Sequence, residues 1–421
     1  MIRYFLFLIF LFSASSVIAQ ENSTSPYSYY GIGDVNFRGT VENRSMGELA
    51  IFSDSIHINL QNPAFYAHLK LTSFTVGGSH RRVNLRTNTE SAGARQTTLD
   101  YLSVAFPVGK KAGVGFGLLP YSAVGYKVRT LETFDGIDLV RTYRGQGGLN
   151  KVFGGASYRL SKTLTAGAEF QYYFGNIEST SEVESANVLT GIQFGTREIN
   201  ESVAGGFGAN FGLSYSEKIT KKLTLSAAAS FSPGASIDYD NERRLLTFQR
   251  FTAGSITIDS DTLTVGNSRI KIPTRFTFGA GIGEDKKWMI GTEAEFRDGS
   301  DLGNRFDLEG DVRFANSHRF SLGGYYIPQY NAFTSYFRRI VYRGGLRYET
   351  TGLVLNGKDI KDISGIIGFG LPISGTFSNL NIGIEYGRRG TRAAGLVEEN
   401  YFNFSVGLSF NDRWFMKRRY D

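Results

Sequence analysis

The stretch YFNFSVGLSF, Tyr401 to Phe410, decides the fold because it alternates without interruption. Side chains of a strand point alternately to opposite faces, so one face of this stretch is fully apolar and the other is small or polar. The apolar row is Phe402, Phe404, Val406, Leu408 and Phe410. Such a strand is typical of a membrane β-barrel, with lipid outside and water or a plug inside. Because hydrocarbon does not tolerate an open sheet edge, we expect this last strand to pair with the first.

The same alternation recurs along the chain after Lys70. We identify fourteen segments, an even number that returns both ends of the barrel to the same side. The segments are residues 71–78, 99–107, 113–121, 151–160, 164–174, 205–215, 223–231, 269–283, 288–296, 319–326, 342–349, 363–371, 380–387 and 401–410. The sequence therefore predicts an all-β fold, a transmembrane antiparallel β-barrel of about 14 strands over residues 71–410.

The links between these segments give an independent test, because bacterial barrels have short periplasmic turns and long outer loops. VGKK, SKT, SEKITKK and GEDKK are short, and they alternate with long links at residues 81–96, 175–204 and 232–268. The link at residues 327–341 is long where a short turn is expected. The strand count is therefore predicted to within two.

Composition agrees with a barrel. The chain has 51 glycines in 421 residues, 14% aromatic residues and a mean hydropathy of −0.19, which alternating strands produce by averaging. It has no cysteine, which excludes disulfides, thiolate metal sites and a lipoprotein anchor. For the net charge of +7, phosphorylated lipid head groups or surface glycans are better partners than nucleic acid, because the chain is predicted to be exported.

The first 19 residues have the pattern of a signal peptide. Arg3 precedes a short apolar core at residues 4–12, and Val17-Ile18-Ala19 before Gln20 resembles a cleavage site. We predict a signal peptide at 1–19, an N-terminal hatch at 20–70, the barrel at 71–410 and a periplasmic tail at 411–421. Trp414 and Phe415 in the tail fit an aromatic girdle. The predicted location is the outer membrane of a Gram-negative cell.

Charged residues fall on the inward faces of the predicted strands. Buried charges persist only when they are paired or hydrated. One interpretation is an interior ladder that braces the wall or docks a plug, and the other is a selectivity surface for a polar solute. The ladder comprises Glu169, Arg275, Glu293, Glu295, Arg319, Arg343, Arg347, Glu349 and Glu385.

The sequence indicates neither a catalytic site nor a metal site. The four histidines lack the spacing of a metal site, and no Ser/His/Asp grouping can be placed at one barrel depth. The run RDGSDLGN lacks the distal glutamate of a calcium loop and fits an outer loop. We predict no catalytic residues, no metal and no cofactor.

Pro120 interrupts the third predicted strand, GVGFGLLPYSAVGY. Proline removes a donor from the ladder, so it indicates either a kink that can open the barrel wall sideways or a strand that ends at Leu119. The glycines of this strand fall on the inward face, where they leave room for a plug.

The segment at residues 20–70 is irregular, with a short helix expected at Met46 to Phe52. Its order of Met46-Gly47, Ser53-Asp54 and Asn62-Pro63-Ala64 resembles the hatch of the FadL-type (OMPP1/FadL/TodX) outer-membrane transporters. Phe65 stands where that family commonly has glycine. The resemblance implies a fourteen-stranded barrel, an N-terminal hatch, a third strand that opens laterally, and transport of hydrophobic compounds. The PorV-like subgroup implies a role in type 9 protein secretion instead.

Two functions follow as expectations. The first is passive transport of hydrophobic or amphipathic small molecules, with movement of the hatch at Asn62, Pro63, Ala64 and Phe65 or passage through a gap at Pro120. The alternative is a non-transporting component or partner of a secretion (type 9-like) or assembly machine, which the charged interior favours. The expected partners are outer-membrane lipid, a hydrophobic ligand and a secretion-machinery protein, and nucleic acid is not expected.

Overall fold

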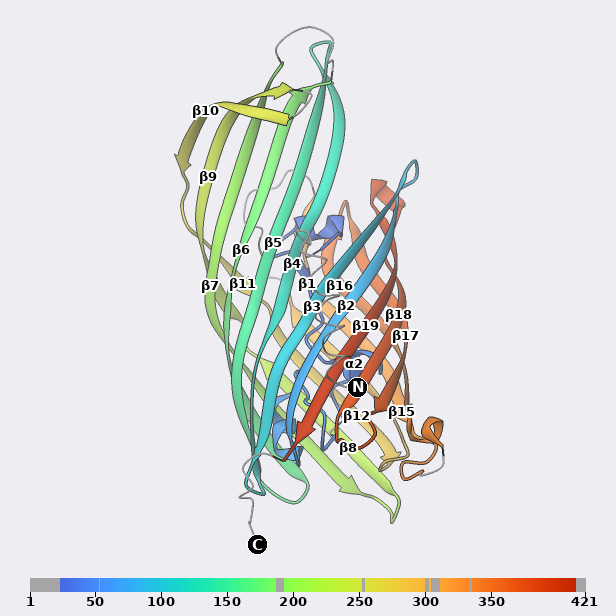
Figure 1. The fold of residues 1–421 in the computed structure, drawn as a ribbon. Coiled ribbons are helices and arrows are strands. Elements are labelled where there is room, and N and C mark those ends of the chain that lie inside the picture. Colours follow the sequence, from blue (N-terminus) through green and yellow to red (C-terminus); the bar gives the residue numbers. More distant parts are fainter. Residues whose placement is uncertain are drawn as a thin grey trace.

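The computed structural model describes residues 23–52, 54–186, 193–251, 254–299, 303, 311–332 and 335–413. The fold is a closed antiparallel barrel of 14 strands (Figure 1). The predicted signal peptide, Trp414 and Phe415 lie outside the described residues. Among the described residues, no helix has the length and apolarity needed to cross a membrane.

Short breaks divide three of the fourteen strands into pieces. Pro233-Gly234 separate β8 from β9, and Pro273 separates β11 from β12, because proline cannot donate to the ladder. The strands are β2 (Thr72–Arg86), β3 (Ser91–Val108), β4 (Ala112–Phe134), β5 (Ile137–Arg159), β6 (Leu164–Ser185), β7 (Gln193–Lys218), β8 (Leu223–Ser232) with β9 (Ala235–Phe251), β10 (Gly254–Thr264) with β11 (Ser268–Ile272) and β12 (Thr274–Glu284), β13 (Trp288–Asp298), β14 (Val312–Phe314) with β15 (Ser317–Tyr326), β16 (Val341–Leu355), β17 (Lys358–Pro372), β18 (Asn379–Gly390) and β19 (Glu398–Asp412). The predicted strand count is confirmed.

The last strand closes the barrel as predicted. β19 pairs with β2 along its whole length, from Glu398 opposite Arg86 to Asp412 opposite Thr72. Its two faces differ as the alternation requires: Phe402 is 47% exposed on the outside, whereas Tyr401 is 2% exposed on the inside. The outer face of the barrel is therefore an apolar belt suited to hydrocarbon.

The two ends of the barrel differ. At one end of the barrel, called the turn end, β2 begins and β19 ends. The connections between strands are short there, apart from residues 327–340, which contain the 3-10 helix η3 (Tyr336–Arg339). This long link is an excursion between β15 and β16 and does not change the strand count. At the opposite, loop end, β18 and β19 are joined through η4 (Ala393–Gly395).

β4 to β7, β9 and β10 rise above the rest of the loop end as a tall sheet (Figure 1). β4 has 23 residues and β7 has 26, whereas about 9–11 residues cross a bilayer. The prediction of long loops at residues 81–96, 175–204 and 232–268 was wrong, since most of these residues extend the strands. Their mixed polarity hides the strand period, but cross-strand ion pairs such as Arg197 to Glu182 (2.7 Å) stabilise the pairing.

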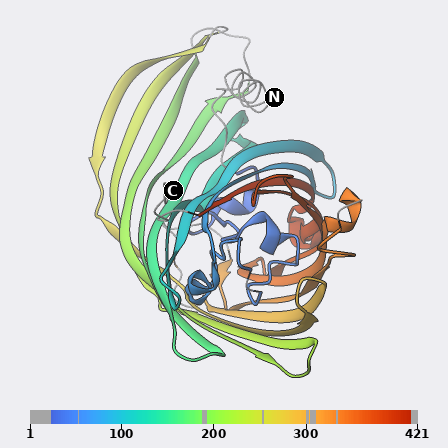
Figure 2. The same ribbon diagram turned by 60° about the horizontal axis from the view of Figure 1, so that its bottom comes forward.

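The N-terminal segment, described from Ser23 to Leu71, lies inside the ring of strands (Figure 2). It contains η1 (Pro26–Tyr29), β1 (Asp34–Val35), α2 (Val41–Arg44) and η2 (Pro63–His68). The helix expected at Met46 to Phe52 was wrong. Gly47 (φ 75°) and Glu48 (φ 70°) adopt left-handed backbone conformations, which end a helix, so the helical turn lies just before them.

Candidate functional site

Glu48 of the N-terminal segment lies at the centre of a charge network in the lumen. The Arg319 guanidinium on β15 lies 2.8 Å from Glu48 and 3.1 Å from Glu295. The Arg347 guanidinium on β16 lies 3.6 Å from Glu48. Burial raises the pKa of Glu48, against the lowering effect of these two arginines. One carboxylate thereby ties the segment to two neighbouring strands.

Arg347 also joins three wall carboxylates. It lies 3.1 Å from Glu349, 3.4 Å from Asp362 and 3.2 Å from Glu385. The Tyr401 hydroxyl, on the inward face of the closing strand, lies 2.9 Å from Arg347 and donates to Asp362 at 2.8 Å. Buried charges need this density of partners, because each loses its hydration.

All nine predicted ladder residues point inward, and several of them contact the N-terminal segment. Glu293 accepts from the Ala50 N–H at 2.8 Å, and Glu169 accepts from the Tyr66 hydroxyl at 2.9 Å. Arg343 and Arg275 bind wall side chains, Asn381 and Ser232 respectively. These contacts favour the docking interpretation of the ladder over a selectivity surface for a solute.

Several members of the network were missed from sequence. Arg38, in irregular backbone, lies 3.4 Å from Glu295, and Arg44, the last residue of the single helical turn α2, lies 3.3 Å from Asp100. Neither stretch is long enough for periodicity to show which way its side chains point. Arg297 was assigned to an outer loop, yet it lies in β13 and contacts Glu295 at 2.8 Å. Its inward direction could have been read from its parity with Glu293 and Glu295.

The Asn62-Pro63-Ala64 motif docks the segment against the wall. Asn62 accepts from the Ala64 N–H at 3.0 Å, which caps η2, and donates to the carbonyls of Leu213 (3.2 Å) and Ala229 (3.0 Å). A Cβ added at Gly212 would lie 2.0 Å from the Asn62 side chain, so the close contact between Asn62 and the wall requires glycine at this position. Phe65, which follows the motif, is 5% exposed.

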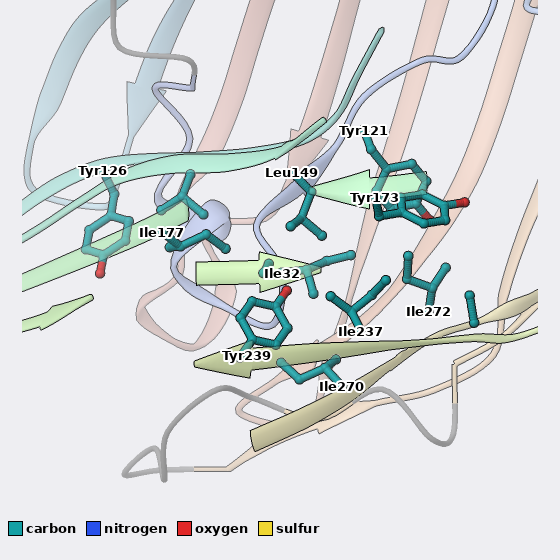
Figure 3. Close-up of a cluster of buried hydrophobic side chains, with 13 residues drawn as sticks. Ile32, Tyr121, Tyr126, Leu149, Tyr173, Ile177, Ile237, Tyr239, Ile270 and Ile272 are labelled. Carbon is teal, nitrogen blue, oxygen red and sulfur yellow. The ribbon is translucent and has the colours of Figure 1, made fainter. Parts of the chain in front are cut away.

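The opposite half of the lumen is apolar. Ile32 of the segment inserts among side chains of the tall sheet (Figure 3). Leu149, Ile177, Ile237 and Tyr239 surround it, each at most 1% exposed. This group, with Tyr121, Val124, Tyr126, Tyr173, Ala204, Ala235, Ile270 and Ile272, is called the apolar cluster below.

Pro120 lies just beyond the point where β4 stops pairing with β3. The β3–β4 pairing stops at Leu102 opposite Leu118, and the β4–β5 register shifts between Pro120 and Ser122. The strand does not end at Leu119 but continues to Phe134. Beyond Leu118, β1 pairs with β4 at Ser122 and Ala123. We call this separation of β3 from β4 the seam.

A cavity of about 200 Å³ lies between the seam and the charge network. Charged side chains line much of it, among them Arg44, Glu48, Arg347 and Glu385, and it reaches Pro120. A second cavity, of about 70 Å³, adjoins Arg275. Pockets for drug-sized ligands are typically about 300–1,000 Å³ and mostly apolar, so the larger cavity suits water or a small polar group.

No metal site is found among the residues that the structure describes. His57 Nδ1 lies 2.7 Å from Asp54, and His68 Nε2 lies 3.1 Å from the Thr165 hydroxyl. Burial, together with the nearby Arg159 charge, lowers the pKa of His68 to about 4, so His68 is neutral at physiological pH. Both histidines therefore have structural partners within the lumen.

Solved structures that share this fold include a monoaromatic hydrocarbon channel and a toluene transporter. The CymD monoaromatic hydrocarbon channel matches 91% of this chain and 100% of its own, with 14% identity and a TM-score of 0.59. The toluene transporter TbuX of Ralstonia pickettii matches 89% and 99%, with 13% identity and a TM-score of 0.57. A FadL homologue of Pseudomonas aeruginosa matches 91% and 99%, with 11% identity and a TM-score of 0.56. Identities this low establish a shared fold and no more.

No curated protein is close enough in sequence to match. The structural matches confirm the fold implied by the FadL-type resemblance, and the PorV-like subgroup is not confirmed. A family model described as BamG, which is not the FadL-type family, matches residues 1–421, the full length of the given sequence. The chain therefore belongs to the BamG family.

Proposed function

We propose that this protein is a closed outer-membrane barrel that acts as a non-transporting component or partner of a protein secretion or assembly machine. The observation that carries the proposal is the occupied lumen: Glu48 is held by Arg319 and Arg347, and Ile32 is buried in the apolar cluster. A conduit would require this segment to move. Movement would separate buried ion pairs, and breaking one such pair costs about 3–5 kcal/mol.

The remaining space in the lumen also argues against a hydrophobic conduit. A hydrocarbon gains roughly 0.8 kcal/mol per methylene only when it reaches apolar surroundings. The larger cavity instead presents Arg44, Arg347 and Glu385. A solute without charge would displace water from these groups and return no hydrogen bonds, which is unfavourable.

The tall sheet gives the proposal its positive support. Its strands exceed the length that a bilayer requires, and β10 is paired on one side only, with β9, among the described residues. A free strand edge offers unpaired backbone groups to a neighbouring chain. An exposed sheet above the membrane is more useful to a protein partner than to a pore.

Transport of hydrophobic small molecules is the second candidate, and the seam at Pro120 favours it. A ligand would enter from the loop end, reach the cavity and leave through the seam, with Asn62 to Phe65 as the moving hatch. The shared fold with hydrocarbon channels supports this route. No catalytic role is proposed in either case.

Tagged protein purified from its native membrane in a mild detergent tests the first function. We expect a stoichiometric membrane partner, and we expect gene deletion to leave secreted or barrel proteins in the periplasm while uptake of labelled toluene or fatty acid is unchanged. Loss of uptake with normal protein export would overturn the proposal in favour of transport. Protein that elutes alone and whose deletion changes neither process would contradict both functions.

A further inference from the structure

The outer face of the barrel carries two like-charged pairs directly across neighbouring strands. Arg82 on β2 lies opposite Arg95 on β3, and Lys127 on β4 lies opposite Arg144 on β5. All four side chains are exposed. Residues directly opposite each other have Cβ atoms about 4.5–5.5 Å apart, where like charges destabilise a sheet. Each pair therefore favours a bound anion.

Two other arginines of the tall sheet have carboxylate partners. Arg141 on β5 lies 3.0 Å from Glu132, and Arg244 on β9 lies 3.3 Å from Glu242. Within the described part of the chain, neither Arg82, Arg95, Lys127 nor Arg144 has an ion-pair partner. The positive charge of the two pairs is thus left for something outside the chain.

The two pairs border the seam on opposite sides. Arg82 and Arg95 belong to the β2–β3 margin, and Lys127 and Arg144 belong to the β4–β5 margin, both beyond the last β3–β4 pair at Leu102 and Leu118. On the β2–β3 margin, the apolar belt begins directly beside Arg82 and Arg95. Phe402 is paired with Arg82, and Leu99 on β3 is 56% exposed. Cations at the edge of an apolar membrane face match a phosphate attached to acyl chains.

We propose that the loop-end mouth of the seam is a binding site for a membrane lipid that carries phosphate in its head group. Arg82 with Arg95 and Lys127 with Arg144 bind the phosphate oxygens, and the acyl chains lie on the apolar surface that includes Leu99, Leu102 and Leu118. Continuity with the apolar belt identifies the ligand as a lipid and not a free phosphate ion. This inference rests on the membrane location in the proposed function and not on a protein partner.

Native mass spectrometry of the detergent-solubilised full chain tests the site. The probes are a bis-phosphorylated glucosamine lipid, its dephosphorylated form and inorganic phosphate. The variants are R82Q/R95Q and K127Q/R144Q, and the matched control is K221Q/K222Q, which removes the same charge from the exposed β7–β8 turn. At about fivefold per cation, we expect each seam variant to bind the phosphorylated lipid roughly 25-fold more weakly and the control to bind within about twofold of the parent.

A second measurement keeps the outcome independent of folding defects. Without lipid, both seam variants should unfold at or above the parent's temperature, because a like-charge repulsion has been removed. Added phosphorylated lipid should then raise the unfolding temperature of the parent more than that of the variants. Equal lipid affinity in parent and variants, equal binding of the dephosphorylated lipid, or displacement of the lipid by an equal concentration of inorganic phosphate would overturn the inference. None of these outcomes depends on whether a partner protein co-purifies.

Discussion

The two halves of the lumen hold the same N-terminal segment by different physics. On the β13–β19 half, Arg319 and Arg347 hold Glu48 through buried ion pairs. On the half formed by the tall sheet, Ile32 packs into the apolar cluster. Ion pairs are sensitive to geometry and fix the position of the segment, whereas apolar burial is tolerant of geometry and supplies stability. Mutations in the charged half and mutations in the apolar half should therefore change the free energy of unfolding by different amounts.

Removal of Arg347 should have the largest effect. Arg347→Met leaves Glu48, Glu349, Asp362 and Glu385 buried without their shared cation, and we expect the free energy of unfolding to fall by about 3–5 kcal/mol. Urea unfolding in lipid vesicles measures it. Arg388→Met is the matched control, because Arg388 is exposed on the outer face of β18. Equal stability of the two variants would mean that the charge network holds nothing.

The apolar half should respond next. Ile32 is 2% exposed, so Ile32→Ala should lower the free energy of unfolding by about 2–4 kcal/mol through lost burial and a cavity. Ile256→Ala, at a side chain that is 59% exposed on β10, should change it by less than about 0.5 kcal/mol. If the two variants unfold alike, Ile32 is not an anchor.

A double-mutant cycle measures whether the two halves of the lumen stabilise the protein independently. Glu48→Gln and Arg319→Met remove partners that lie 2.8 Å apart, so their effects on the free energy of unfolding should be coupled by about 1–3 kcal/mol. Glu48→Gln and Ile32→Ala act on opposite halves and should add to within about 0.5 kcal/mol. Strong coupling of the second pair would show that the segment docks as one cooperative unit.

The smallest effect should be the pH dependence from His57. Burial and the nearby Arg343 charge both act to lower the pKa of His57. The carboxylates of Asp54 at 2.7 Å and Glu42 at 3.6 Å outweigh them, so the pKa is raised. The stabilisation is therefore complete below the unfolded value of about 6.5 and is lost as pH rises through the folded pKa. His57→Gln should flatten this part of the stability profile. An unchanged profile would contradict the assignment.

The features predicted correctly from the sequence are those that the alternation of side chains determines. The strand Tyr401 to Phe410, its pairing with the first strand and the inward charges all follow from alternation, because one face of each strand meets apolar surroundings. The contacts of the N-terminal segment could not be predicted. Arg38 and Glu48 lie in irregular backbone and Arg44 ends the single helical turn α2, so their partners are set by tertiary packing. The tall sheet was missed for a related reason, since above the apolar belt its strands lose the difference between faces.

Locking the segment in place tests whether the lumen must open for the protein to function. The chain has no cysteine, so Val41→Cys with Gly407→Cys gives a single cysteine pair. The Cβ that Gly407 would carry lies 3.3 Å from the Val41 Cβ, close to the spacing of about 3.5–4.5 Å in disulfides. The pair is introduced together with Tyr101→Phe, because that Cβ would lie 2.5 Å from the Tyr101 hydroxyl. The measurement is complementation of a gene deletion by this variant, with the pair oxidised and then reduced. We expect equal protein export in both states. Function lost on oxidation and regained on reduction would show that the segment must move, which would contradict a closed barrel.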